Sequence, residues 1–286
     1  MKMSKKILPA LAMLIVSAVM LSTASFAWFA MGESVTANGM SVSIKSDSLY
    51  LLIAAVNEET IAEGYTAETT VLTAEQLQAY KNGTSGEKVG STSAEGYAIG
   101  TTDIYPSAFY QEDVLMGKDN SGNRTVGVTK GTDLANAAIW YTATAENADA
   151  SAMKDGTDTP LTSFDGYVVR YRYYVTLDKG SNAMDTLTVS NLTITLPDPA
   201  GSGTHVKPVR VIVACGDQME EFNQGRAGTV DLTGENGSID DQTALEIILY
   251  VYYDGNDSTV TTNAVAAISD AEITFTLKAE NSSTGD

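Results

Sequence analysis

Alternation of apolar and polar residues with a period of two constrains the fold of this chain most, because β-strands place successive side chains on opposite faces. The pattern is clearest in residues 166–178. One face of this segment carries five large apolar side chains, those of Tyr167, Val169, Tyr171, Tyr173 and Val175. The opposite face carries Val168, Arg170, Arg172 and Tyr174. The tyrosines add apolar area, and each hydroxyl group requires a hydrogen-bonding partner or water.

Several other segments carry the same strand signal, namely residues 40–45, 48–56, 186–198, 206–215, 244–257 and 271–280. In the last segment Ile273, Phe275 and Leu277 share the face that we expect to point inward. Residues 206–215 and 244–257 are almost continuously apolar, which predicts central strands covered on both faces. Short strands separated by Gly, Asn and Asp turns predict an all-β fold, a jelly-roll-like β-sandwich.

Three local features refine this prediction. The alternation in residues 186–198 changes register between Val189 and Leu192, which predicts a β-bulge near Ser190 and Asn191. A capping box formed by Thr73 and Gln76, followed by Gly83 as a stop signal, predicts a short surface helix. The segment Gly216–Gly225, GDQMEEFNQG, is predicted to form a second helical turn on a loop.

The sequence divides into four parts by composition and pattern. Residues 1–27 form a leader, and residues 28–56 hold an N-terminal strand and the first core strand. Residues 57–165 are rich in Gly, Ser, Thr and Asp and have only brief apolar runs, which predicts an insertion of long loops and short helices. Residues 166–286 supply the remaining strands of the sandwich.

The leader has the three parts of a secretory signal peptide. Lys2, Lys5 and Lys6 precede an apolar run of about 15 residues, and small residues follow it. We expect residues 1–27 to form a hydrophobic signal helix that contacts the membrane only transiently. Cleavage between Ala27 and Trp28 would then release a secreted product. Cleavage after Ala24 also satisfies the small-residue rule, and residues 7–31 are long enough to be retained as a membrane span.

Charge and residue usage exclude several classes of function. The leader lysines are three of the 17 basic residues, so the mature chain has 14 basic and 36 acidic residues and a formal charge of −22. Such a charge repels phosphate backbones, and nucleic acid is not expected as a partner. With one cysteine and one histidine, the chain can form no intrachain disulfide and no Cys/His zinc site with the usual four side-chain ligands. Cys215 ends an apolar run and is predicted to be a buried thiol.

No residue pattern indicates an enzyme. His205 lies in a loop with no serine motif near it, and no motif distinguishes any pair among the 36 acidic residues. Three Asp- and Asn-rich loops, KDNSGN, TGENGSIDD and DGND, have the composition of calcium ligands but not the spacing of an EF-hand. No cofactor is therefore expected, and a structural calcium ion is left as an alternative to ordinary turns.

The junction after the leader is similar to that of a known family. STASFAWF is followed by a polar segment, an ANG turn and the alternating strand GMSVSIK, and the chain closes with YVYYDGND and ITFTLKAE. This arrangement resembles the TasA/camelysin family of secreted proteins of Gram-positive bacteria, whose leaders are removed by a SipW-type signal peptidase. Thr23, Ala27, Trp28 and Phe29 approximate the cleavage pattern of that family.

The resemblance implies a jelly-roll subunit of an extracellular biofilm fibre. Assembly would proceed by donor-strand pairing, in which the N-terminal segment of one copy completes a sheet of the next copy. The residues that would carry this pairing are Trp28, Phe29, Val35, Met40, Val42 and Ile44. The implied partner is a further copy of the chain or a related matrix protein.

Two other functions remain open from the sequence. The first is a surface adhesin or glycan-binding module whose platform is formed by aromatic residues of the insertion, Tyr105, Phe109, Tyr110, Trp140 and Tyr141. The second is a membrane-retained, pilin-like subunit whose uncleaved N-terminal helix packs into a filament.

Overall fold

A computed structural model describes the chain in thirteen segments, residues 41–46, 50–58, 60–61, 63–81, 93–99, 106–111, 114–115, 128–142, 160–195, 209–223, 230–234, 237–255 and 271–281. The chain forms two compact units, Met1–Val35 and Thr36–Asp286, and every described residue belongs to the second. The predicted signal helix and the cleavage site at Ala27 and Trp28 lie outside the described residues. Within the described segments, no helix has both the length and the apolar character needed to cross a membrane.

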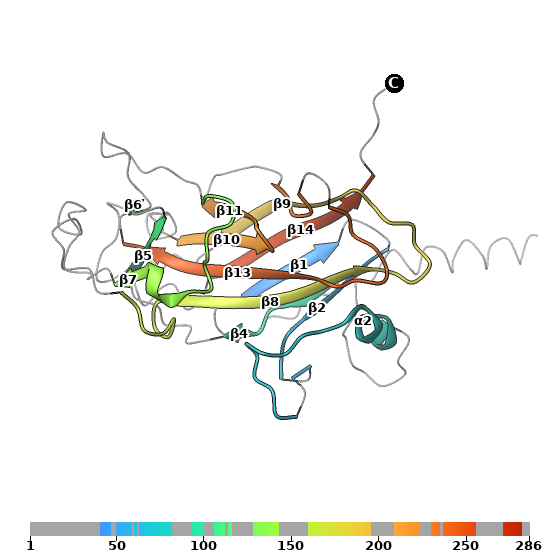
Figure 1. Cartoon of the computed structure of the whole chain (residues 1–286), viewed down its shortest axis with the longest axis horizontal. Coiled ribbons are helices and arrows are strands. Elements are labelled where there is room, and N and C mark those ends of the chain that lie inside the picture. The colour runs from blue at the N-terminus through green and yellow to red at the C-terminus, as the bar shows by residue number, and fades with distance from the viewer. Residues whose placement is uncertain are drawn as a thin grey trace, which may run out of the picture. The chain divides into compact units, whose positions relative to one another are not determined.

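Strands make up nearly all of the regular structure, which confirms the prediction of an all-β, sandwich-like protein (Figure 1). The first sheet has five strands in the order β12-β9-β14-β1-β3. Their bounds are Val230–Asp231, Thr186–Thr195, Glu272–Glu280, Ser41–Ser46 and Ser93–Glu95. The second sheet has nine strands and includes the path β11-β10-β13-β5-β6. Its path strands are Gln218–Asn223, Val209–Cys215, Leu245–Asp254, Pro106–Gln111 and Val114–Leu115, and β8 (Val168–Leu177), β2 (Leu51–Ala55), β4 (Ala98–Ile99) and β7 (Trp140–Thr142) pair alongside them.

The two sheets share one apolar core, to which the long strands β8, β9, β13 and β14 contribute alternate residues. Val169, Tyr171, Tyr173 and Val175 of β8 all lie in this core, as the alternation predicts. Phe275 of β14 meets Tyr173 edge-on, with ring centroids 6.5 Å apart. Such contacts join the sheets because each is apolar on its inner face and must bury that face against another element.

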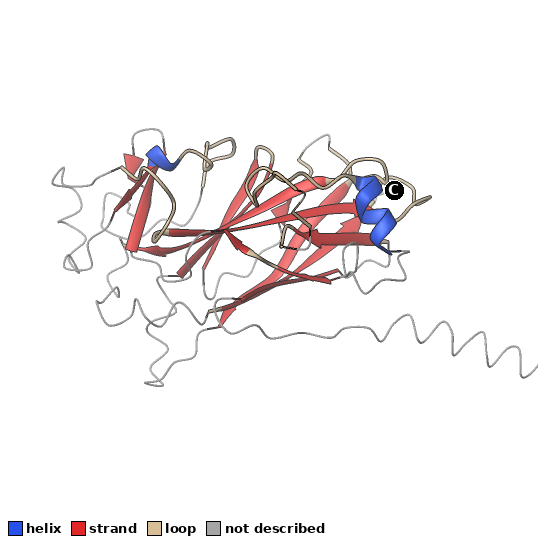
Figure 2. Cartoon of the chain, turned by 90° about the horizontal axis from the view of Figure 1, so that it is seen from below, coloured by secondary structure: helices blue, strands red, loops and turns tan. Residues whose placement is uncertain are grey.

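The outer face of the nine-stranded sheet is also covered, at two places. At one end a cluster around Trp140 packs on Tyr250 and Tyr252, and it includes Phe109 and Phe164. At the other end α2 (Ala74–Lys81) and the chain before it pack on Leu52, Ala54 and Tyr174. Figure 2 shows α2 and the 3-10 turn η1 (Ala137–Ile139) at opposite ends of the sheets. The prediction that β10 and β13 are covered on both faces is therefore confirmed.

The helix and the bulge that the sequence predicts are both present. The Thr73 hydroxyl accepts a hydrogen bond from the Gln76 N–H at 3.2 Å, and the Gln76 side chain accepts one from the Thr73 N–H at 2.8 Å, so the capping box is confirmed. Gly83 lies outside the described residues. The register of β9 against β14 shifts between Thr274 and Thr276, opposite Asn191, whose φ is +52°. An extra residue with positive φ is a common way to bend an antiparallel strand.

The prediction of a helical turn at Gly216–Gly225 is wrong. This segment forms the second strand of a hairpin, because Gly216 and Asp217 make a two-residue turn and β11 then runs back along β10. Gly216 has φ of +58°, as two-residue hairpin turns require. Tertiary contacts fix the strand, since Phe222 enters the shared core and Glu221 is fully buried on the outer face.

A buried cluster of charges lies where this hairpin meets β13. Arg210 is 2% exposed and lies between two carboxylates, with Nε 3.7 Å from Glu221 and Nη2 3.5 Å from Asp254. The Tyr252 hydroxyl donates a 3.0 Å hydrogen bond to Glu221. Both acids are also buried. Among the described residues around them, the Arg210 guanidinium group is the cation that balances their negative charge.

Cys215 is a buried free thiol, as predicted. Burial, with smaller contributions from Glu246 and Asp217, raises the pKa of this thiol to about 11. Thiolate is the reactive form, so at pH 8 the folded protein holds almost none of it. We expect Ellman's reagent to label Cys215 slowly in the folded protein and rapidly in denaturant. Labelling at equal rates in the two conditions would contradict the burial of this side chain.

Candidate functional site: the first strand

The predicted assembly strand occupies an interior position in the five-stranded sheet. β1 pairs in parallel with the last strand, β14, from Ser41 opposite Glu272 to Ser46 opposite Leu277. On its other side it pairs antiparallel with the three residues of β3. Figure 1 shows β1 and β14 side by side, although they lie at opposite ends of the sequence. A strand near the start of the second unit thus completes a sheet by pairing with a strand near the end of that unit.

Alternate side chains of β1 enter the shared core. Val42 is 1% exposed and Ile44 is fully buried, whereas Ser43 between them is half-buried on the other face. The core around them includes Leu51 of β2 and Phe275 of β14. The alternation predicted for this segment is confirmed, and Val42 and Ile44 fill apolar positions in a sheet of their own chain. Their use by a second copy stays a prediction.

The backbone of β1 is held by hydrogen bonds at Val42. Its carbonyl oxygen accepts one from the Gly96 N–H at 2.8 Å and one from the Tyr173 hydroxyl at 3.1 Å. Gly96 is required here, because a Cβ atom at this position would collide with the side chains of Tyr171 and Tyr173. Burial raises the pKa of Tyr173 well above its usual range, with smaller contributions from Tyr171 and Glu95, so the phenol keeps its proton and remains a donor.

Replacing Tyr173 by phenylalanine tests this bond across the sandwich. The ring stays in the core while the donor to Val42 is lost, so we expect unfolding free energy to fall by about 1–2 kcal/mol. Hydrogen exchange at the β1 amides should accelerate more than exchange in β10. Tyr171→Phe is the matched control, because it removes a tyrosine hydroxyl from the adjacent inward position of the same strand. If the two substitutions accelerated hydrogen exchange at the β1 amides equally, Tyr173 would have no specific role at β1.

The remaining residues of the predicted assembly segment cannot be placed. Trp28, Phe29, Val35 and Met40 lie outside the described residues. The contribution of Gly96 and Tyr173 was missed by sequence reasoning. A signal existed for Tyr173, since a tyrosine at an inward position requires a partner for its hydroxyl group.

The aromatic residues proposed as a glycan platform do not form one exposed surface. Phe109 and Trp140 are fully buried, and their ring centroids lie 4.9 Å apart. The Trp140 indole N–H donates to the Leu134 carbonyl at 3.1 Å, so its polar atom is satisfied inside the protein. Tyr141 is half-buried, Tyr105 lies outside the described residues, and Tyr110 lies in β5. Phe109 and Trp140 are therefore core residues and are not available as parts of an exposed glycan platform.

The predicted chemical sites can be followed only in part. In the described segments, no group of three or more His, Cys, Asp and Glu side chains could hold a metal ion. Of the calcium candidates, KDNSGN lies outside the described residues, and the other two loops are described in part. His205 also lies outside them.

Comparisons with known proteins found no match. No family model matches the chain, and neither a curated protein nor a solved structure matches it.

Proposed function

We propose that this protein is a secreted structural subunit of an extracellular fibre or biofilm matrix. In this proposal it is a jelly-roll-like sandwich whose N-terminal signal helix is removed after Ala27, and copies assemble by donating the segment from Trp28 to Ser46. The proposal rests on the likeness of the leader junction to the TasA/camelysin family. The observation that supports it is the position of β1 in the sheet. This short strand lies between β14 and β3, which both come later in the chain.

The position of β1 supports this exchange. Without β1, β14 would have an unpaired edge along Glu272–Leu277, and the core positions of Val42 and Ile44 would be empty. An unpaired edge is a template for pairing with another chain. A neighbour's β1 offers the same main-chain and side-chain contacts as the chain's own.

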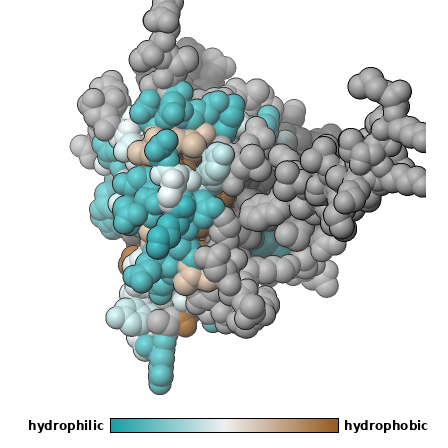
Figure 3. All heavy atoms as spheres, turned by 90° about the vertical axis from the view of Figure 1, so that its right-hand side faces the viewer, coloured by the Kyte–Doolittle hydropathy of each residue, from teal (hydrophilic) through white to brown (hydrophobic). Residues whose placement is uncertain are grey.

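Exchange in one direction gives a filament. If each copy donates β1 to the next and accepts one from the previous copy, the contact is heterologous and does not close on itself. On the face drawn in Figure 3 the described residues are mostly hydrophilic, and the chain carries a formal charge of −19. Such a surface disfavours association through apolar patches, so a buried strand is a better-suited contact.

A pair of engineered cysteines distinguishes self-completion from exchange. Ser43 and Thr274 are register partners across β1 and β14, so cysteines placed there are close enough for a disulfide bond. In fibres of the exported double variant, exchange predicts a ladder of covalent oligomers on a non-reducing gel. The control pairs Ser43→Cys with Thr186→Cys, which lies on β9 beyond β14 and should give no ladder. A disulfide formed only within single chains in assembled material would disprove strand donation.

Terminal mass analysis and electron microscopy of the same exported sample complete the test. A chain that starts at Trp28 and forms filaments is expected, and deletion of residues 28–38 should abolish those filaments. Monomers that are unaffected by the deletion would overturn the proposal. A chain that still starts at Met1 would instead favour the membrane-retained, pilin-like alternative.

A further inference from the structure

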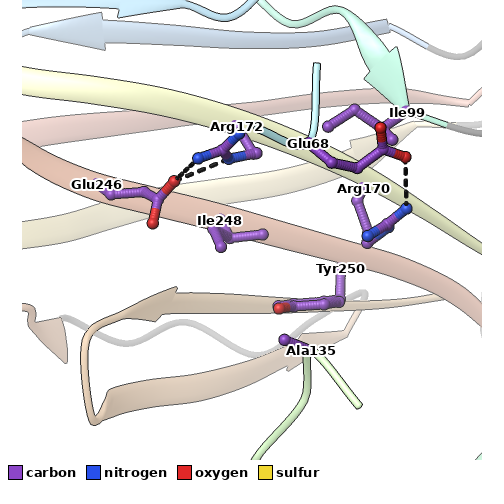
Figure 4. A pocket seen from close by; sticks show the side chains of 8 residues that line it. All are labelled: Glu68, Ile99, Ala135, Arg170, Arg172, Glu246, Ile248 and Tyr250. Carbon is purple, nitrogen blue, oxygen red and sulfur yellow. Dashed lines mark hydrogen bonds and ion pairs between the residues drawn. The ribbon is translucent and has the colours of Figure 1, made fainter. Parts of the chain in front are cut away.

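A small pocket lies on the outer face of the nine-stranded sheet, where the two covering clusters leave the strands open. It has a volume of about 190 Å³, and its polar lining comes from Arg170 and Arg172 of β8, Glu246 of β13, and Glu68. Ile248 and Tyr250 line it as well (Figure 4). Four charged side chains thus surround one hollow on this face of the sheet.

One wall of the pocket is rigid. Arg172 donates from Nε to Glu246 Oε1 at 2.7 Å, from Nη1 to the Ala67 carbonyl at 2.6 Å, and from Nη2 to the Tyr174 hydroxyl at 2.7 Å. The Tyr174 hydroxyl also donates to Glu246 Oε1, at 2.7 Å. Arg172 Nη2 also donates to Glu246, and every bond that reaches this carboxylate ends on Oε1. Glu246 Oε2 therefore makes no hydrogen bond to the part of the chain that the structure describes, and it remains an acceptor.

The opposite wall has unused donors. Arg170 makes one ion pair, from Nη2 to Glu68 Oε1 at 3.3 Å, and its guanidinium group lies 4.3 Å from the centre of the Phe164 ring. Its Nε is buried without a hydrogen-bonding partner, and Nη1 makes no bond to any described residue. A guanidinium group can donate five hydrogen bonds, so Arg170 has capacity for a ligand. Figure 4 shows it across the pocket from Glu246.

The balance of charge selects the class of ligand. Two arginines and two glutamates cancel within the pocket, and the chain as a whole carries a formal charge of −19, which disfavours a free anion. Burial raises the pKa of Tyr250 to about 12, so this side chain is neutral as well. A polyhydroxyl compound can both accept from a guanidinium group and donate to a carboxylate without a charge of its own. Sugar rings have this property, and their C–H faces pack on apolar and aromatic walls.

We propose that this pocket binds one neutral sugar unit of a polysaccharide. Arg170 donates to the sugar hydroxyls, Glu246 accepts from them, and Ile248 and Tyr250 contact the ring. The volume fits a single ring, because pockets for drug-sized ligands occupy about 300–1,000 Å³. The lining residues come from the nine-stranded sheet and from the segments that cover its outer face, and none comes from β1, so binding is independent of strand exchange.

To test this proposal, the exported protein is titrated with the methyl glycosides of glucose, galactose, mannose and N-acetylglucosamine. Binding is measured by saturation-transfer NMR. Saturable binding of at least one glycoside is expected. Arg170→Gln should weaken it at least tenfold, and Glu68→Gln should weaken it less, since Glu68 acts by positioning Arg170. Lys130→Gln is the matched control, because it removes another ion-paired cation, here exposed and outside the pocket, and it should leave binding unchanged.

Three outcomes would overturn the inference. One is the absence of saturable binding for all four glycosides. Another is unchanged affinity in the Arg170→Gln variant when its Tm is also unchanged. The third is tighter binding of glucuronate or glycine than of any neutral glycoside, which would assign the pocket to an anion or a zwitterion. If Arg170→Gln fails to fold, the half-exposed Glu68 decides the question, because unchanged affinity in Glu68→Gln then counts against the site.

Discussion

Replacing Ile44 by lysine is expected to unfold the monomeric protein. Ile44 is fully buried between the two sheets, and truncating such a residue to alanine alone costs about 2–5 kcal/mol. A lysine must also place an unpaired ammonium group in the core or lose its proton there. The total approaches the whole stability of an ordinary domain, about 5–15 kcal/mol. Circular dichroism in urea should show a large fall in the transition midpoint or no folded baseline.

The matched control is the same substitution one residue earlier. Ser43 points to the other face of the sheet and lies opposite Glu95 of β3, so a lysine there meets water and an acidic neighbour. We expect the Ser43→Lys midpoint to remain close to that of the wild type. If Ile44→Lys and Ser43→Lys behave alike, β1 does not occupy the core position described above.

Replacing Arg210 by methionine is expected to have the second-largest effect. The substitution keeps most of the side-chain volume but leaves the carboxylates of Glu221 and Asp254 buried without their cation. Breaking a buried ion pair by removal of one partner costs about 3–5 kcal/mol. Urea denaturation monitored by circular dichroism provides the measurement.

Two companions identify the cause of that loss. Adding Glu221→Gln to Arg210→Met removes one stranded charge, so the double variant should be more stable than the single variant. Lys130→Met breaks an exposed ion pair with Asp217, 3.4 Å long, and should leave the transition midpoint unchanged. A single variant as stable as the wild type would show that the cluster around Arg210 contributes nothing to folding.

Most of the strands could be predicted from the sequence, but their partners could not. The alternation in β8 and β14 identified which side chains enter the core, and the register change in β9 identified the bulge at Asn191. A period of two specifies faces and not neighbours, because any strand with the right face can complete a sheet. The parallel pairing of β1 with β14 therefore required the tertiary structure. The hairpin strand β11 was missed because the local sequence does not indicate that Glu221 is buried beside Arg210.

The candidate sites show the same division. Val42 and Ile44 were predicted correctly as one face of a strand, while the chain whose sheet that strand completes cannot be read from a pattern. Arg170 and Arg172 were placed on the opposite face from the core tyrosines. Their meeting with Glu68 and Glu246 depends on residues about 70 to 100 positions away in the chain. Phe109 and Trp140 had the composition of a binding surface, but in the structure they are core.

The parallel pairing of β1 with β14 also determines how the protein would respond to tension. The chain enters β1 at Ser41, beside Glu272, and leaves β14 at Glu280, beyond the opposite end of their six paired positions. A pull that draws these two points apart slides the strands along each other, and it loads the hydrogen bonds between them together rather than one after another. The parallel pair of β1 and β14 therefore resists this shear. If β1 belongs to the neighbouring subunit, force along the fibre reaches it at Ser46, where it joins its own subunit, and the strand is again loaded along its length at each junction.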